Sequence, residues 1–236
     1  MNETIVKTVV VEKRSDGIAV VTLNRPEAAN AFSKQMLSDL HQAVSDLKYD
    51  ADVRVVIFTG SGEKAFCAGA DLKERKGMSD EQVKQTVRYI GSAVKAVEDL
   101  PQPTIAAING VAFGGGLELA LGCDLRIGAS EAKVGLTETS LAIIPGAGGT
   151  QRLPRLIGLG KAKELIYTAK RLNAEEAVSI GILEYAVPRS NLREKALELA
   201  IAIAKNGPLA LKQAKIAINQ GFEADLATAL KIEELA

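Results

Sequence analysis

Short runs of valine, isoleucine and other apolar residues recur along the first 190 positions, with turn residues between them. Such runs predict β-strands, and a run without polar interruptions predicts a strand that is covered on both faces of a sheet. The predicted strands are residues 4–13, 18–23, 53–59, 104–108, 125–129 and 182–187. Ser15-Asp16-Gly17 separates the first two and indicates that they form a hairpin.

A second pattern places apolar residues three and four positions apart and predicts amphipathic helices. Ser33 can cap one of them, and Ser79 with Gln82 and Asn173 with Glu176 are spaced as capping boxes. The predicted helices are residues 33–49, 79–100, 117–121, 161–168, 173–179, 192–204, 208–219 and 224–235. Strands and helices alternate as far as about residue 185, which predicts an α/β fold.

The last part of the chain is helical only, so we divide the sequence into a core, residues 1–190, and a helical C-terminal region, residues 191–236. The final apolar periodic segment ends at Ala236 without a glycine cap, and we therefore expect this region to be incomplete. Residues 72–78 are charged and contain a glycine, which is typical of a mobile lid or of a solvated connection.

Composition narrows the function classes. The 236 residues include 29 basic and 29 acidic side chains, so no net charge attracts DNA, RNA or an anionic membrane. No apolar run is long enough for a membrane span, and the N-terminus lacks the pattern of a signal peptide. Two cysteines cannot form a disulfide framework, which favours a cytoplasmic location. His41 is the only histidine, so neither a zinc site nor a Ser-His-Asp triad is expected.

The candidate chemistry lies in residues 105–138. An apolar run is followed by the glycines at 114–116, and a leucine-rich helix begins there. Glycines at such a turn let a ligand touch the main chain, and the free amides of a helix N-terminus suit a developing oxyanion. Glu118 lies in the first turn of this helix, and Glu138 lies 20 residues further on among small and apolar residues. Two carboxylates beside such amides can move protons next to a carbonyl group.

Other interpretations of these residues stay open at this point. The glycines could be a packing notch between helix and sheet, and Glu118 would stabilise a helix N-terminus in any protein. Cys67 has no base near it in sequence and is interpreted as a buried apolar residue rather than a nucleophile. The Gly-x-Gly-Gly at residues 146–149 lacks the third glycine and the acidic residue of a dinucleotide fingerprint, so it is rejected as one.

Four further segments stand out: Leu23-Asn24-Arg25-Pro26 with Asn30-Ala31, residues 65–71 (AFCAGAD), residues 107–118 (AINGVAFGGGLE) and residues 144–152 (IPGAGGTQR). Together and in this order they resemble the enoyl-CoA hydratase (crotonase) family, and the resemblance covers nearly the whole chain. The resemblance implies a spiral of ββα units, a ClpP-like fold, with a helical C-terminal region used in trimerisation. It also implies a homo-oligomer, either a trimer or a dimer of trimers, and an acyl-CoA thioester as the substrate.

Site residues follow from the resemblance by their positions in these motifs. The backbone amides of Ala70 and Gly115 would form the oxyanion hole. Glu118 and Glu138 would be the catalytic pair, and the Gly146 amide would position the water. Hydratases of the family carry both glutamates, so the resemblance favours water addition to a 2-enoyl-CoA, in fatty-acid or branched-chain amino-acid breakdown. Neither a cofactor nor a metal is expected.

Substrate and coenzyme A contacts are expected from seven further residues in or beside the same motifs: Arg25, Glu27, Ala28, Ala68, Asp71, Leu72 and Lys73. A basic residue is common in the family where this chain has Glu27, so Arg25 and Lys73 are the candidates for phosphate contacts.

The resemblance leaves alternative functions. An enoyl-CoA isomerase has the same fold and uses mainly one glutamate. Residues 141–155 also resemble the methylglutaconyl-CoA hydratase subgroup, some of whose members bind AU-rich RNA through a lysine-rich helix. Here the corresponding helix has Lys34 and Lys48 against Asp39 and Asp46, so RNA binding is not expected and a non-catalytic RNA-associated role is the least favoured alternative.

Overall fold

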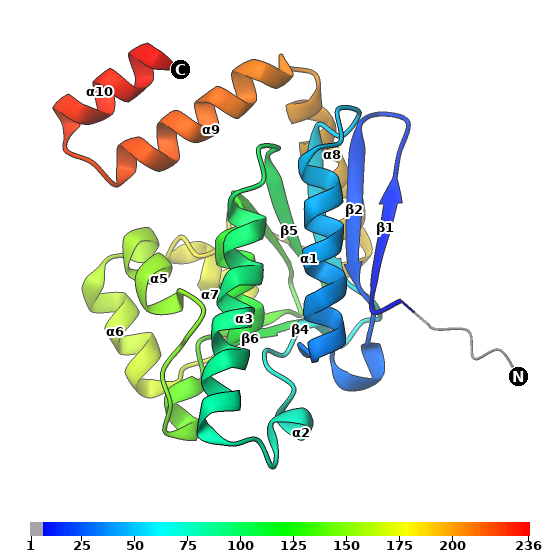
Figure 1. Ribbon diagram of the computed structural model, residues 1–236, viewed down its shortest axis with the longest axis vertical. Helices are drawn as coiled ribbons and strands as arrows, with labels where there is room; N and C mark the ends of the chain where they lie inside the picture. The colour runs from blue at the N-terminus through cyan, green and yellow to red at the C-terminus, as the bar shows by residue number, and fades with distance from the viewer. Residues whose placement is uncertain (1–6) are drawn as a thin grey trace, which may run out of the picture.

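The computed structural model describes residues 7–236, and its centre is a six-stranded sheet (Figure 1). The order of its strands is β1-β2-β3-β5-β7-β10. They comprise β1 (Val9–Lys13), β2 (Ile18–Leu23), β3 (Val55–Gly60), β5 (Thr104–Ile108), β7 (Leu125–Ala129) and β10 (Tyr185–Val187). β1 is antiparallel to β2, and all the other pairs are parallel. All six strands were predicted, although residues 4–6 of the first lie outside the described residues.

A second sheet of four strands has the order β4-β6-β8-β9. Its members are β4 (Ala65–Cys67), β6 (Val111–Phe113), β8 (Lys133–Gly135) and β9 (Leu172–Asn173). The sequence analysis missed all four, because two or three residues are too few to show a periodicity. Strand pairs that are consecutive in the chain, such as β3 and β4 or β5 and β6, divide between the two sheets, and helices follow them. This is the expected spiral of ββα units.

The helices mostly begin and end where caps and apolar spacing placed them. They are α1 (Lys34–Lys48), α2 (Leu72–Arg75), α3 (Asp80–Glu98), α4 (Gly115–Gly122), α5 (Gly149–Ile157), α6 (Leu159–Thr168), α7 (Ala174–Ser179), α8 (Arg189–Ala204), α9 (Pro208–Phe222) and α10 (Leu226–Leu235), with 3-10 helices η1 (Pro26–Ala28) and η2 (Glu138–Leu141). Ser33 accepts a hydrogen bond from the Met36 amide, and both predicted capping boxes form. The prediction missed α5 and the short α2.

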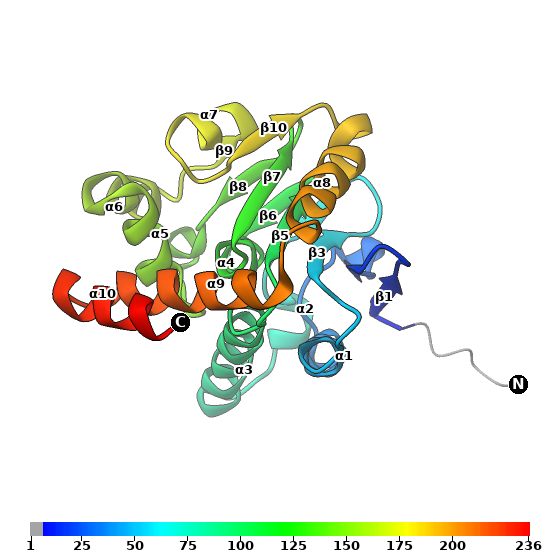
Figure 2. The same cartoon turned by 90° about the horizontal axis from the view of Figure 1, so that it is seen from above.

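Helices cover both faces of the six-stranded sheet. Figure 2 shows the sheet between α8 on one side and the neighbouring α1 and α3 on the other. All side chains of β5 are buried, as the continuous apolar run predicted. The buried face of α1 carries Leu37, Leu40 and Leu47, and that of α3 carries Val94 and Val97. Burial of these side chains is the main force that holds the helices on the sheet.

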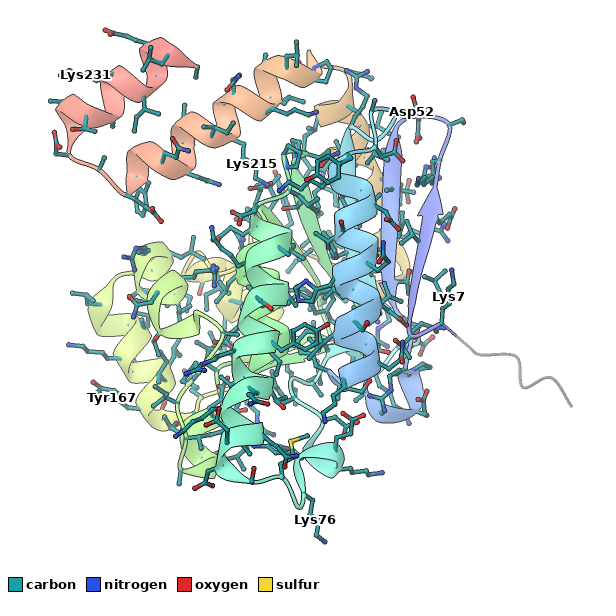
Figure 3. All side chains as sticks on the ribbon, in the orientation of Figure 1. Lys7, Asp52, Lys76, Tyr167, Lys215 and Lys231 are labelled. Atoms are coloured by element: carbon teal, nitrogen blue, oxygen red, sulfur yellow. The ribbon has the colours of Figure 1, made fainter. Side chains whose placement is uncertain are left out.

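The last two helices form an antiparallel arm that extends from the body (Figure 1). Neither α9 nor α10 contains a buried residue, and large apolar side chains such as Phe222, Leu226 and Leu235 are exposed. Lys215 lies on the side of α9 that faces the body, where Nζ donates to Asp124 Oδ2 at 2.8 Å (Figure 3). Among residues 7–236, no helix is both long enough and apolar enough to cross a membrane.

Candidate active site

One cavity, of about 110 Å³, brings together seven of the residues singled out in the sequence. They are Ala68, Ala70, Leu72, Gly115, Glu118, Glu138 and Gly146. They come from the loop after β4, from α2, from α4, from η2 and from the loop before α5. The cavity therefore lies where three successive turns of the spiral meet.

The loop after β4 is pinned beside the N-terminus of α4. The Phe32 amide donates to the Gly69 carbonyl at 2.8 Å, and the Asp71 amide donates to the Phe32 carbonyl at 3.0 Å. Gly69 has φ +89°, and a Cβ there would lie 3.2 Å from the Gly115 nitrogen, so the two segments are in close contact. Within residues 7–236, the amides of Ala70 and Gly115 donate to no other part of the protein. Both residues line the cavity.

The glycines at 114–116 permit a contact that a side chain would prevent. Gly114 has φ +52° and turns the chain from β6 into α4. A Cβ on Gly116 would lie 1.9 Å from the Cys67 carbonyl oxygen, so α4 begins directly against β4. The strand that leads into these glycines is thus β6, which the sequence analysis missed, while the predicted strand at residues 104–108 is β5 and ends before it. The packing-notch interpretation is correct for Gly116 and is compatible with a site at Gly115.

Glu118 is buried at the inner end of the cavity, with 2% of its surface exposed. Its Oε1 accepts hydrogen bonds from the amides of Ala147 and Gly149, both at 2.8 Å. Burial raises the pKa of this carboxyl group, while the two amides and the positive charge of Arg152 partly offset the increase. Because both amides bind Oε1, the other carboxylate oxygen of Glu118 is left for a ligand in the cavity.

Glu138 differs from Glu118 in having a buried oxygen without a partner. It is the first residue of η2, and its Oε2 has no hydrogen-bond partner among the described residues. Burial raises the pKa of this carboxyl group to about 7, a bond from its own backbone amide lowers it, and the nearby charge of Glu118 raises it further. A Cβ on Gly114 would lie 3.0 Å from Glu138 Oε1, so the side chain lies against the turn into α4. Near pH 7 this group can give or take a proton.

The structure does not bring the other five predicted contacts to the cavity. Arg25 donates to Asp71 Oδ2 at 3.1 Å, and Asp71 also caps α2 by accepting from the Lys73 and Glu74 amides. Glu27 and Lys73 are exposed, and Ala28 is half-buried in η1. Arg25 and Asp71 thus hold the loop after β4 in place from outside the cavity.

Several lining residues escaped the sequence analysis. They are Gly69, Arg75, Val87, Ile90, Thr137, Leu141, Ile143, Ile144 and Ala147. The motif at residues 144–152 was recognised, but nothing in it indicated that the Ala147 and Gly149 amides bind Glu118 rather than a ligand. Val87 and Ile90 belong to the apolar face of the predicted helix that forms α3, and this part of the face lines the cavity.

Cys67 and His41, which were excluded as catalytic residues, do not line the cavity. Cys67 is fully buried, and burial raises the pKa of its thiol to about 12, so it is not a nucleophile at neutral pH. His41 is partly exposed, and its ring stacks on Tyr89 between α1 and α3, with ring centroids 4.9 Å apart. Residues 7–236 contain no group of three His, Cys, Asp or Glu side chains placed to hold a metal ion.

Residues 13–235 match the family model described as enoyl-CoA hydratase/isomerase. The chain belongs to this family. A relative in Bacillus subtilis (strain 168), YngF, is 57% identical over 223 residues, which cover 94% of this chain and 86% of that protein. The mitochondrial methylglutaconyl-CoA hydratase of Mus musculus is 50% identical over 227 residues, which cover 94% of this chain and 72% of that protein.

A crystal structure of an enoyl-CoA hydratase from Bacillus anthracis superimposes with a TM-score of 0.95 at 54% identity, and the match covers 97% of this chain and 88% of that one. The predicted α/β crotonase fold is therefore confirmed. The enzymes of this family act on acyl-CoA substrates.

Proposed function

We propose that the protein is an enoyl-CoA hydratase, which adds water syn across the double bond of a 2-enoyl-CoA to give a 3-hydroxyacyl-CoA. The observation that carries the proposal is that Glu118 and Glu138 line the same cavity as the amides of Ala70 and Gly115. A hydration site needs both parts. It needs donors for the oxygen on which charge develops, and it needs carboxyl groups that handle the protons of one water molecule.

The two amides would act on the thioester oxygen. Attack of water on Cβ pushes electron density into the conjugated carbonyl, and hydrogen bonds from Ala70 and Gly115 would stabilise the resulting oxyanion. One such donor typically lowers the barrier by about 3 to 4 kcal/mol. Both amides lie at loop or helix starts that the surrounding backbone holds in place, so little reorganisation is needed during the reaction.

The two glutamates would divide the proton transfers. In the hydration direction, ionised Glu118 would accept a proton from the water as its oxygen bonds to Cβ, and the Gly146 amide would help to position that water. Protonated Glu138 would give its proton to Cα. The raised pKa of Glu138, about 7, supports this role because the group is still substantially protonated near neutral pH. Proton transfers alone complete the reaction, so we propose that no cofactor or metal takes part.

Isomerisation of a 3-enoyl-CoA is the second candidate, and one observation favours it. Glu118 is already bound by two amides, whereas Glu138 has a buried oxygen without a partner. A single base of that kind can move a proton between Cα and Cγ. Product analysis with 3-hexenoyl-CoA separates the two reactions, because an isomerase gives 2-hexenoyl-CoA and a hydratase gives no product from it.

Paired variants test the leading proposal. We expect Glu118→Gln and Glu138→Gln each to lower the rate of crotonyl-CoA hydration by about 10²- to 10⁴-fold, because each removes a proton acceptor or donor. The assay follows the loss of absorbance of the conjugated thioester, and calorimetry of butyryl-CoA binding shows that the site is intact. Turnover at the wild-type rate by both variants would contradict the proposal.

The assembly and location extend the same proposal. We propose a trimer or a dimer of trimers in which the exposed apolar residues of α9 and α10 contact a neighbouring subunit, because an isolated chain leaves them in water. Light scattering would measure the molar mass.

We propose a cytoplasmic location, because the two cysteines are free. We also propose that the acyl group is short or branched, because the cavity is small. The 3-methylglutaconyl group that the mouse relative's name specifies is one such group.

A further inference from the structure

One side chain of the cavity has no role in the proposed chemistry. Arg75, the last residue of α2, lines the same cavity as Glu118 and Glu138. It is the only basic residue among the described residues that line this cavity, and the two glutamates are the only acidic ones. Around them the wall is largely apolar, with Leu72, Val87, Ile90, Leu141, Ile143 and Ile144.

The guanidinium group of Arg75 is available to a ligand. Its guanidinium group makes neither a hydrogen bond nor an ion pair with any of residues 7–236, although three other arginines of the site region, Arg25, Arg152 and Arg155, bond to side chains or carbonyls. Two nearby acids on the same segment are already occupied. Asp71 binds Arg25 and caps α2, and Glu74 accepts a hydrogen bond from the Lys34 amide at 3.0 Å.

Arg75 is half-buried at the wall of the cavity, so its charge is available to an anionic ligand that enters. The planar guanidinium group matches a carboxylate, which it can bind through two parallel N–H···O bonds. Pockets for larger organic ligands measure roughly 300–1,000 Å³, whereas this cavity measures about 110 Å³, so it suits a short acyl chain and not a nucleotide. The anion that Arg75 meets inside the cavity is therefore part of the acyl group rather than a phosphate of coenzyme A.

We propose that Arg75 selects acyl groups that end in a carboxylate, as in a glutaconyl thioester, by binding that carboxylate at the far end from the thioester. This inference rests on the proposed function for the position of the thioester beside Ala70 and Gly115. The two glutamates would repel an anionic acyl group, and Arg75 offsets that repulsion.

Binding of saturated thioesters tests this inference independently of catalysis. Calorimetry compares glutaryl-CoA with 5-methylhexanoyl-CoA, in which an isopropyl group replaces the carboxylate at the same position. We expect Arg75→Met to weaken glutaryl-CoA binding by about 10- to 100-fold relative to 5-methylhexanoyl-CoA, because a charge-assisted pair is lost. Arg75→Lys should recover part of the preference, since it keeps the charge without the planar fork.

Lys76→Met is the matched control, because Lys76 is exposed, follows Arg75 directly and does not line the cavity. It should leave the preference for glutaryl-CoA as in the wild type. An equal loss of both thioesters in Arg75→Met, or a loss of binding of coenzyme A itself, would overturn the inference in favour of a general or phosphate contact. Crotonyl-CoA hydration, measured separately, reports on the proposed function, so a failure of one assignment is distinguishable from a failure of the other.

Discussion

The guanidinium group of Arg152 donates to both carboxylate oxygens of Glu98, from Nε to Oε1 at 2.9 Å and from Nη2 to Oε2 at 2.8 Å. Its Nη1 also donates to the Ala147 carbonyl at 3.0 Å. The amide of Ala147 is one of the two that bind Glu118. Helix α3 is thereby connected to Glu118 through one arginine and one residue of the loop before α5.

Removal of this arginine is expected to affect Glu118 in two ways. Arg152→Met should loosen the loop and lower hydration turnover by about 10-fold, with a loss of about 1–3 kcal/mol in the free energy of unfolding. It should also raise the pKa of Glu118, because the positive charge of Arg152 lowers it in the wild type. The acidic limb of the pH–rate profile would then move to higher pH. Urea unfolding measures the loss of stability, and steady-state kinetics measure the turnover and the pH–rate profile.

Lys95→Gln provides the control, since exposed Lys95 contacts the same Glu98 at 3.2 Å but does not touch the loop. An exposed ion pair contributes roughly 0–1 kcal/mol, so this variant should keep the wild-type pH profile. If Arg152→Met also kept that profile, Arg152 would be a structural residue without influence on Glu118.

Glu138→Gln should stabilise the protein at alkaline pH although it impairs catalysis. The pKa of Glu138 is raised from its usual 4.5 to about 7, so between these values the folded state binds more protons than the unfolded state and the free energy of unfolding falls as pH rises. Glutamine removes this penalty. The gain should be absent at pH 4, grow between pH 4.5 and 7, and reach up to about 3 kcal/mol at pH 8, measured by urea unfolding.

Hydration itself should depend on the same ionisation. Because protonated Glu138 is the proposed donor to Cα, kcat/KM for crotonyl-CoA hydration should fall as pH rises above about 7. Dehydration of 3-hydroxybutyryl-CoA should show the same dependence of kcat/KM over this range, because the overall reaction neither takes up nor releases a proton and both directions need the glutamate pair with one proton. A hydration rate that increases steadily from pH 6 to 9 would contradict the assignment of Glu138 as the acid.

Two helical glycines should respond in opposite ways to alanine. Gly116→Ala would place a Cβ 1.9 Å from the backbone oxygen of Cys67, which cannot move aside, and should cost about 3 kcal/mol or more. Gly160→Ala in α6 meets nothing within 4 Å and should stabilise the protein by about 0.5 kcal/mol. Thermal and urea unfolding of the two variants compare these effects, and equal stabilities would show that α4 does not press on β4.

Neither cysteine should react in the folded protein. Burial raises the thiol pKa to about 12 for Cys67 and for Cys123, so the reactive thiolate is scarce at pH 8 and is also shielded from reagents. Labelling with a disulfide reagent should proceed at the rate of unfolding, whereas both thiols should react at once in guanidinium chloride. Rapid labelling of one thiol in native buffer would place a cysteine within reach of the solvent.

Local patterns predicted the larger elements because each depends on neighbours in the chain. The Ser79–Gln82 and Asn173–Glu176 capping boxes formed as their spacing indicated, and β2, β5 and β7 begin and end at the expected residues. The four short strands of the second sheet escaped, because Val111–Phe113 and Lys133–Gly135 are strands through pairing with each other and with β4 and β9. The sequence contains no signal for a pairing between residues so far apart.

The sequence by itself determined the α/β alternation, the caps and the presence of two glutamates among apolar residues, since these follow from residue type and spacing. Only the tertiary structure decided which groups meet. It placed Glu118 between the amides of Ala147 and Gly149, left Glu138 Oε2 without a partner, and brought Arg75 into the cavity while Arg25 was bound to Asp71. The physical reason is that burial and long-range hydrogen bonds set the pKa and the availability of each group, and both arise only when the spiral closes.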